Sequence, residues 1–246
     1  MASSSLAARA VPRDAALDLL KWLAFASMVL DHLRYVRSGL DMLYLPGRLA
    51  FPLFCLAIAA NLARRPETRQ LPWRYLGGLL LFAVLAEGPY RLFIPLPDTF
   101  NVLPTLVLGL LIADGLQGPR GIKGGLALGA LLVAGVLRER LMFGLSGALL
   151  PAALLLALRF GPRAWPLAAL VGLAANSWPD LYLRAAEGQP FWLLVILICL
   201  AAPVAGLWLL RRGLPGRVPP VRRWAYLAYP GHFLLLWLLR ESGLPG

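Results

Sequence analysis

Residues 190–210 read PFWLLVILICLAAPVAGLWLL and contain no charged side chain. A helix needs about 20 predominantly apolar residues to cross the hydrocarbon core of a bilayer, so this run predicts a transmembrane helix. Eight further apolar segments lie at 17–36, 43–63, 71–90, 102–116, 122–137, 141–158, 164–183 and 224–239. The alternating pattern of a membrane β-barrel is absent, and a helix satisfies its backbone hydrogen bonds internally. We therefore predict an all-α polytopic membrane bundle of about nine transmembrane helices, with a range of eight to ten.

The composition agrees with a membrane location. Hydrophobic residues make up 59% of the chain and charged residues 15%, whereas an ordinary soluble domain carries about a quarter charged residues. The net charge of +12 would suggest nucleic-acid binding in a soluble protein, but the basic residues form short clusters between apolar runs. We therefore expect membrane lipids as surroundings and no nucleic acid. Cys55 and Cys199 lie in apolar runs and the chain has two histidines, so we expect no metal site.

The chain divides into a cytoplasmic N-terminal tail at 1–16, a single transmembrane domain at 17–241 and a short C-terminal tail at 242–246. Most basic residues between spans fall on the side of the N-terminus, which predicts a multi-pass protein of the cell inner membrane with a cytoplasmic N-terminus. A cleaved signal is disfavoured because the first apolar run carries Lys21, Asp31 and His32. Gly77-Gly78 and the Gly125-xxx-Gly129 pattern predict close helix packing.

Ionisable groups inside spans are the informative residues, because each costs about 2.5–3.5 kcal/mol at a helix centre on insertion scales. On the nine-span topology, one set of polar residues arrives near the outer face: Asp31, His32, Arg48, Glu87, Tyr90, Arg91, Asn101 and Asn176. Tyr229 and His232 belong to the last span and are expected nearer the cytoplasmic half. Polar groups at both depths predict a hydrated cavity that reaches from one face towards the other.

Each of these residues also has a structural interpretation. Asp31 with Arg34 and Glu87 with Arg91 have the spacing of helical ion pairs, and Lys21 can extend its amino group to the interface. Asn176 can bridge helices, and His232 can bond backbone carbonyls freed at Pro230-Gly231. For His32, a chemical and a structural role are equally favoured by the local sequence.

Several blocks of sequence resemble one known family. They are LKWLA at 20–24, MVLDH at 28–32, GRLAFPLF at 47–54, PYR at 89–91, NVL at 101–103, FGLSG at 143–147 and YLAYPGH at 226–232. In this order they resemble the TraX family of conjugal-transfer and pilin-modifying membrane proteins. Ala228 and Gly231 depart from the residues usual in the last block.

The resemblance implies an acyltransferase that moves an acetyl group from acetyl-CoA to the N-terminal amine of a pilin-like protein. Its catalytic residues would be His32, Asp31 and Arg48. Neutral His32 would be the general base or would carry the acetyl group covalently. Asp31 would hold either His32 or Arg48, and Arg48 would stabilise the thioester oxyanion or bind a phosphate of CoA.

The polar positions of the predicted topology also supply predicted binding residues. The predicted substrate-binding residues are Glu87, Tyr90, Arg91, Asn101 and Asn176. Tyr229 and His232 are predicted to guide acetyl-CoA, and the basic clusters at 64–74 and 211–223 either attract its phosphates or only set the topology.

Two other functions stay open at this point. One keeps acyl transfer but places the acetyl group on a hydroxyl of a cell-envelope glycan or lipid. The other is a transporter or proton-coupled channel in which Asp31 and His32 relay protons. The sequence has no visible internal repeat, which counts against the transporter.

Overall fold

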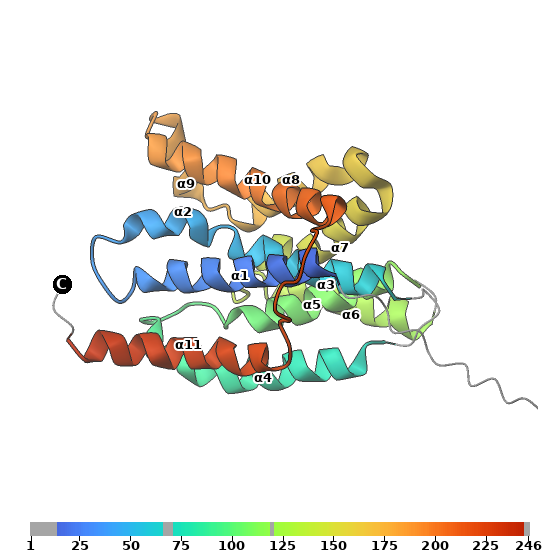
Figure 1. The fold of residues 1–246 in the computed structure, drawn as a ribbon, viewed down its shortest axis with the longest axis horizontal. Helices are drawn as coiled ribbons and strands as arrows, with labels where there is room; N and C mark the ends of the chain where they lie inside the picture. The colour runs from blue at the N-terminus through green and yellow to red at the C-terminus, as the bar shows by residue number, and fades with distance from the viewer. Residues whose placement is uncertain (1–13, 66–70, 119–120, 244–246) are drawn as a thin grey trace, which may run out of the picture.

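The computed structural model describes residues 14–65, 71–118 and 121–243, and within these ranges every regular element is a helix (Figure 1). Most of the predicted N-terminal tail, the last three residues of the predicted C-terminal tail and part of the 64–74 cluster lie outside the described residues. The helices, in chain order, are α1 (Ala15–Leu33), η1 (Asp41–Leu43), α2 (Tyr44–Gly47), α3 (Ala50–Ala63), α4 (Trp73–Phe93), α5 (Val102–Gly115), α6 (Ile122–Val136), α7 (Gly144–Phe160), η2 (Gly161–Ala164), α8 (Trp165–Ala175), α9 (Pro179–Ala186), α10 (Pro190–Arg212) and α11 (Trp224–Glu241).

The helices form a layered bundle in which most axes run along the longest dimension (Figure 1). Helix α11 lies beside α4 on one side, α8 and α10 lie on the other, and α1, α3, α5 and α7 fill the middle. The core sits in this middle layer, where Leu20, Leu56, Leu110 and Leu154 are fully buried. A polar group held between these central helices is therefore shielded by protein on both sides.

Four helical segments in the described part of the chain are long and apolar enough to cross a membrane: Asp41–Ala63, Trp73–Phe93, Gly144–Ala175 and Pro190–Arg212. The predicted all-α membrane bundle is confirmed. Helices α5 and α6 are apolar but shorter, and 14 residues of α5 at about 1.5 Å each span less than the roughly 30 Å hydrocarbon core. The count of nine spans and the cytoplasmic N-terminus stay predictions.

Two of the predicted spans are interrupted in the structure. The predicted helix at 164–183 is wrong, since α8 ends at Ala175 and α9 begins at Pro179. Trp178 is extended, as expected of a residue that precedes proline. The 43–63 segment turns between α2 and α3, where the N–H of Arg48 bonds Leu45 O, three residues back. Both interruptions matter because each one places a polar side chain of the site.

The expected close packing is confirmed at Gly78, where an added Cβ would lie 3.1 Å from the Tyr226 side chain on α11, and is wrong at three other glycines. A Cβ added at Gly77, Gly125 or Gly129 would meet no atom within 4 Å. Two of the close approaches between helices occur where a glycine faces a proline inside the neighbouring helix. A Cβ at Gly109 would lie 2.7 Å from Pro151 Cγ, and one at Gly172 would lie 2.7 Å from Pro203 Cγ. Small residues thus bring α5 to α7 and α8 to α10, but at positions fixed by proline rings.

Candidate functional site

Arg48 is the centre of a hydrogen-bonded cluster, which we call the Arg48 cluster. One guanidinium nitrogen donates to Asp31 Oδ1 at 3.1 Å, and the other terminal nitrogen donates to Asn176 Oδ1 at 3.2 Å. The guanidinium carbon lies 4.0 Å from the centre of the Tyr44 ring, a cation–π geometry. Asp31 also accepts from Arg34 Nε at 3.3 Å. The two helix interruptions therefore meet through the bond between Arg48 and Asn176, and Arg48 connects them to Asp31 on α1.

A glycine permits this arrangement. Gly47 ends α2 directly against Asp31, and a Cβ at this position would lie 2.6 Å from Asp31 Cβ and 2.7 Å from its carboxylate carbon. Ordinary carbon contacts are about 3.5–4.0 Å. Any side chain at position 47 would therefore move the carboxylate that Arg48 binds.

The two histidines form a direct pair. His32 Nδ1 lies 2.8 Å from His232 Nε2, and the rings are nearly parallel, with 15° between their planes and 5.0 Å between their centres. His232 is buried, and its Nδ1 is hydrogen-bonded to the backbone carbonyl of Tyr229. The buried rings of Phe93 and Phe233 lie beside His32, with centres 6.1 Å and 5.0 Å away. Apolar aromatic walls thus surround a polar pair.

The histidine pair corrects two expectations. His232 lies at the same depth as His32, whereas the sequence predicted different depths. Helix α11 runs beside the C-terminal half of α1 and brings the two rings into contact. The ring nitrogen of His32 that has a partner bonds His232, while Asp31 binds Arg34 and Arg48. Of the two roles considered for Asp31, the structure has it hold Arg48. The predicted bond of His232 to a backbone carbonyl is confirmed.

A small cavity of about 70 Å³ joins the Arg48 cluster to the histidine pair, and we call it the histidine cavity. Its walls include Asp31, His32, Arg48, Asn176 and Tyr229. Arg48 Nε is buried and finds no hydrogen-bond acceptor among the residues that the structure describes. A wall residue of the cavity thus carries a guanidinium donor that no described residue uses.

Glu87 and Asn101 form a separate group at the start of α5. One carboxylate oxygen of Glu87 accepts from Arg91 Nε at 2.7 Å, and the other accepts from the backbone N and the side-chain Nδ2 of Asn101 at 3.0 and 2.7 Å. Asn101 also caps α5 by accepting from Leu103 N. The Tyr90 hydroxyl pairs with Thr99. These contacts tie the end of α4 to the start of α5.

Of the five predicted substrate-binding residues, Asn176 alone is among the described residues that line the histidine cavity. Glu87, Tyr90, Arg91 and Asn101 stand apart, and their binding role stays a prediction. The expected ion pairs of Asp31 with Arg34 and of Glu87 with Arg91 are both present. In the described ranges, no group of three or more His, Cys, Asp or Glu side chains is placed to hold a metal ion.

A family model described as "TraX protein" matches residues 16–240 of this chain. The chain belongs to the TraX family.

Individual relatives of this TraX-family chain match over shorter segments. "Protein TraX" of Escherichia coli (strain K12) is 40% identical over 67 residues, which is 27% of each chain. A second Escherichia coli "Protein TraX" is 36% identical over 76 residues, 30% of this chain and 29% of the relative. An uncharacterized protein of Rickettsia prowazekii (strain Madrid E) is 29% identical over 93 residues, 37% of this chain and 34% of the relative. The chain thus aligns with about a third or less of the length of these relatives, and no solved structure matches it.

The structure gives physical roles to residues of this TraX-family chain that sequence reasoning missed. Tyr44 supports the Arg48 guanidinium, Gly47 makes room for Asp31, and Phe233 packs on both histidines. Gly47 stood in the GRLAFPLF block, where its position next to Arg48 was a signal for a tight approach. Tyr44 and Phe233 carry no such signal, because aromatic residues are common in apolar spans.

Proposed function

We propose that this protein is an integral membrane acyltransferase that transfers the acetyl group of acetyl-CoA to the N-terminal amine of a pilin or a related protein. The observation that carries the proposal is that His32, paired with His232 behind it, and Arg48, whose Nε has no acceptor among the described residues, both line one small cavity. The TraX membership supports a pilin-like acceptor through the resemblance described above.

The hydrogen bonds of the pair determine which nitrogen of neutral His32 is basic. A backbone carbonyl only accepts, so His232 Nδ1 carries the proton that bonds Tyr229 O. The Nε2 of neutral His232 then has a lone pair and accepts from His32 Nδ1–H. The remaining nitrogen, His32 Nε2, carries the lone pair of a general base. His232 is thus a positioning residue that selects the tautomer of His32.

Arg48 suits the other half of the reaction. When an amine attacks a thioester carbonyl, negative charge develops on the carbonyl oxygen, and a fixed donor at that oxygen lowers the barrier. Arg48 is held by Asp31 and Asn176 through its two terminal nitrogens, which leaves Nε for this oxygen. Its orientation is set before substrate arrives.

The proposed reaction forms one bond between heavy atoms, from nitrogen to carbon, and breaks one, from carbon to sulfur. The substrate nitrogen forms a bond to the acetyl carbon, and His32 Nε2 takes a proton from that nitrogen. The carbon–sulfur bond of the thioester then breaks, and the proton passes from His32 to the leaving thiolate of CoA. The histidine cavity of about 70 Å³ corresponds to roughly two water molecules at about 30 Å³ each, which suits a two-carbon acyl group better than a long chain.

The test uses the purified full chain with radiolabelled acetyl-CoA and a synthetic peptide that carries a pilin N-terminus. Wild-type protein should label the α-amine of the peptide. His32→Ala should lower the rate by at least about 100-fold, and Arg48→Ala should lower it by about 100-fold or more. Arg138→Gln is the matched control, because this arginine is 68% exposed and pairs only with its neighbour Glu139 among the described residues.

Each outcome decides between the functions. Wild-type rates in both cavity variants would reject the assignment of His32 and Arg48. Label on a glycan or lipid hydroxyl, with none on the peptide, would favour the O-acetylation function. No transfer at all, together with substrate flux in proteoliposomes, would favour a transporter.

A further inference from the structure

We propose that a second, larger pocket binds the phosphate-bearing end and the flexible arm of the acyl donor, so that the protein recognises a phosphorylated thioester such as acetyl-CoA. This inference rests on the proposed function and adds a binding site to it. We call this site the aromatic pocket.

The aromatic pocket has a volume of about 370 Å³, within the range of ligand sites, and lies between α1, α3, α4, α5 and α11. One side is closed by the segment between α10 and α11, which crosses α1 (Figure 1). Trp22 Nε1 donates to Pro219 O at 2.9 Å, and the Trp22 and Trp224 rings lie 5.2 Å apart. The start of α11 is thereby anchored to α1, which leaves a defined pocket behind it.

The charge of the pocket has a single sign. Lys21, Arg222 and Arg223 line it, and no carboxylate does so among the described residues. Lys21 has Asp18 at 3.8 Å, whereas no ion pair is present for Arg222 or Arg223 within the described part of the chain. Three cations next to an apolar pocket complement an anionic head attached to an uncharged arm. On the predicted topology, Arg222 and Arg223 face the cytoplasm, where CoA is found.

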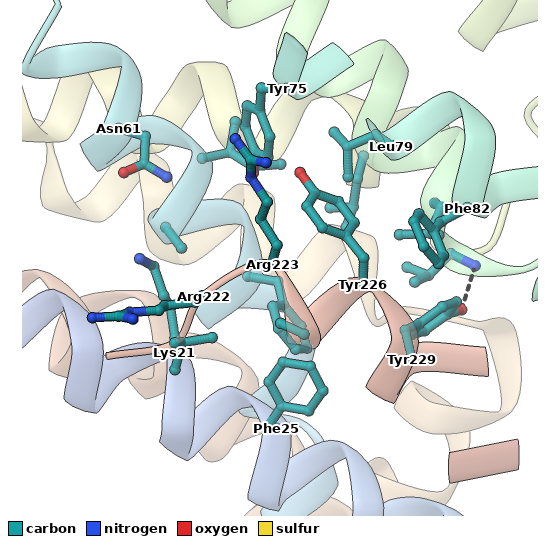
Figure 2. Close-up of a pocket in the computed structure, with 18 residues that line it drawn as sticks. Lys21, Phe25, Asn61, Tyr75, Leu79, Phe82, Arg222, Arg223, Tyr226 and Tyr229 are labelled. Carbon is teal, nitrogen blue, oxygen red and sulfur yellow. Dashed lines mark hydrogen bonds between the residues drawn. The ribbon is translucent and has the colours of Figure 1, made fainter. Parts of the chain in front are cut away.

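The pocket changes character along its length. Figure 2 shows Lys21, Arg222 and Asn61 at one end and Tyr229 with Phe82 at the other, with Arg223, Tyr75 and Tyr226 between them. The Tyr226 and Phe82 rings are stacked, with centres 5.3 Å apart. Aromatic faces with hydroxyl and amide groups at intervals suit an arm that carries amides, because such an arm needs both apolar contact and hydrogen-bond partners.

The aromatic pocket adjoins the histidine cavity. Phe54, Val102 and Tyr229 line both. The Tyr229 hydroxyl accepts from Val102 N at 3.3 Å, and the backbone of the same tyrosine holds His232. A donor with its phosphates at Lys21, Arg222 and Arg223 therefore directs its far end, the thioester, towards His32. The charged end and the reactive end of one molecule would occupy the two cavities.

The experiment compares two charge-matched triple variants of the full chain in nanodiscs made of zwitterionic lipid. The pocket variant is Lys21→Gln with Arg222→Gln and Arg223→Gln. The control is Arg37→Gln with Arg138→Gln and Arg184→Gln, which removes the same charge from three exposed arginines that lie outside the aromatic pocket and outside both basic clusters. The probe is free CoA, and its affinity is measured by equilibrium binding. The Kd should rise at least tenfold in the pocket variant and should not change in the control.

A second measurement separates phosphate recognition from catalysis. The KM for acetyl-CoA should rise at least tenfold in the pocket variant, while the KM for S-acetylpantetheine, which lacks the phosphates, should not change. Ala225→Trp, which fills the pocket from the half-buried start of α11, should weaken both donors. His32→Ala should bind CoA like wild type, so failed catalysis is distinguishable from failed donor binding.

Two results would overturn the inference. One is equal CoA affinity in the pocket and control variants. The other is an anionic phospholipid that co-purifies with wild type, is lost from the pocket variant and is not displaced by saturating CoA, because the pocket would then be a lipid site. CoA binding in a protein that transfers no acetyl group would refute the proposed function but leave this site standing.

Discussion

Replacing Gly47 with alanine should disturb the site through a single methyl group. The added Cβ would lie 2.6 Å from Asp31 Cβ and 2.7 Å from its carboxylate carbon. Compared with a normal carbon contact of about 3.5–4.0 Å, the overlap is about 1 Å at two atoms. Asp31 cannot move freely, because its carboxylate binds both Arg34 and Arg48.

The magnitude follows from this overlap. Overpacking of a filled interior typically costs about 1–3 kcal/mol, which corresponds to a fall in Tm of about 2–12 °C for a chain of this size. If the overlap is relieved by moving Asp31, the Arg48 guanidinium also turns. We therefore expect the rate of acetyl transfer to fall at least about tenfold, since oxyanion donors act through their position.

The assay is thermal unfolding in detergent, followed by the transfer rate at a temperature where the variant is folded. Gly77→Ala is the matched control: Gly77 lies inside α4, and its added Cβ would meet no atom within 4 Å. This control should keep or raise the Tm, because alanine favours a helix by about 1 kcal/mol over glycine. Equal Tm values and equal rates for the two variants would refute the close approach of Gly47 to Asp31.

Three further predictions concern other parts of the molecule. The chain has two histidines, so ¹⁵N NMR of histidine-labelled protein can resolve both, and it should show His32 protonated at Nδ1 and unprotonated at Nε2. His232→Ala should give a mixture of the two His32 tautomers and a lower kcat. A mixture already present in the wild type would contradict the proposed orientation. Asn101→Ala should destabilise the fold by about 1–3 kcal/mol in thermal unfolding, because this buried side chain both caps α5 and bonds Glu87 of α4. An unchanged Tm would argue against this link between α4 and α5. Cys55 and Cys199 are free and 0% exposed, so a maleimide should label neither thiol in the folded protein and both after denaturation in SDS. Rapid labelling of either thiol before denaturation would be inconsistent with its burial.

The sequence alone was sufficient for the features that depend on near neighbours in the chain. The charge-free run at 190–210 forms the long apolar helix α10, because hydrophobicity and length are local properties. The ion pairs of Asp31 with Arg34 and of Glu87 with Arg91 formed for the same reason: helix geometry alone brings residues three or four apart together. The GRLAFPLF block likewise identified a region around Arg48 before its partners were known.

The tertiary structure decided the contacts that join distant segments. The local sequence around His32 does not indicate that its partner is His232, 200 positions away. Likewise, the sequence around Arg48 does not indicate that it bonds Asn176, 128 positions away. These contacts depend on two helix interruptions and on the placement of α11 beside α1. Both determine which side chains face each other, and a pattern of hydrophobic residues contains no information on either. Tyr229 was predicted to guide acetyl-CoA, but the aromatic pocket around it could not be predicted, since its walls come from five helices whose mutual spacing is set only when they pack.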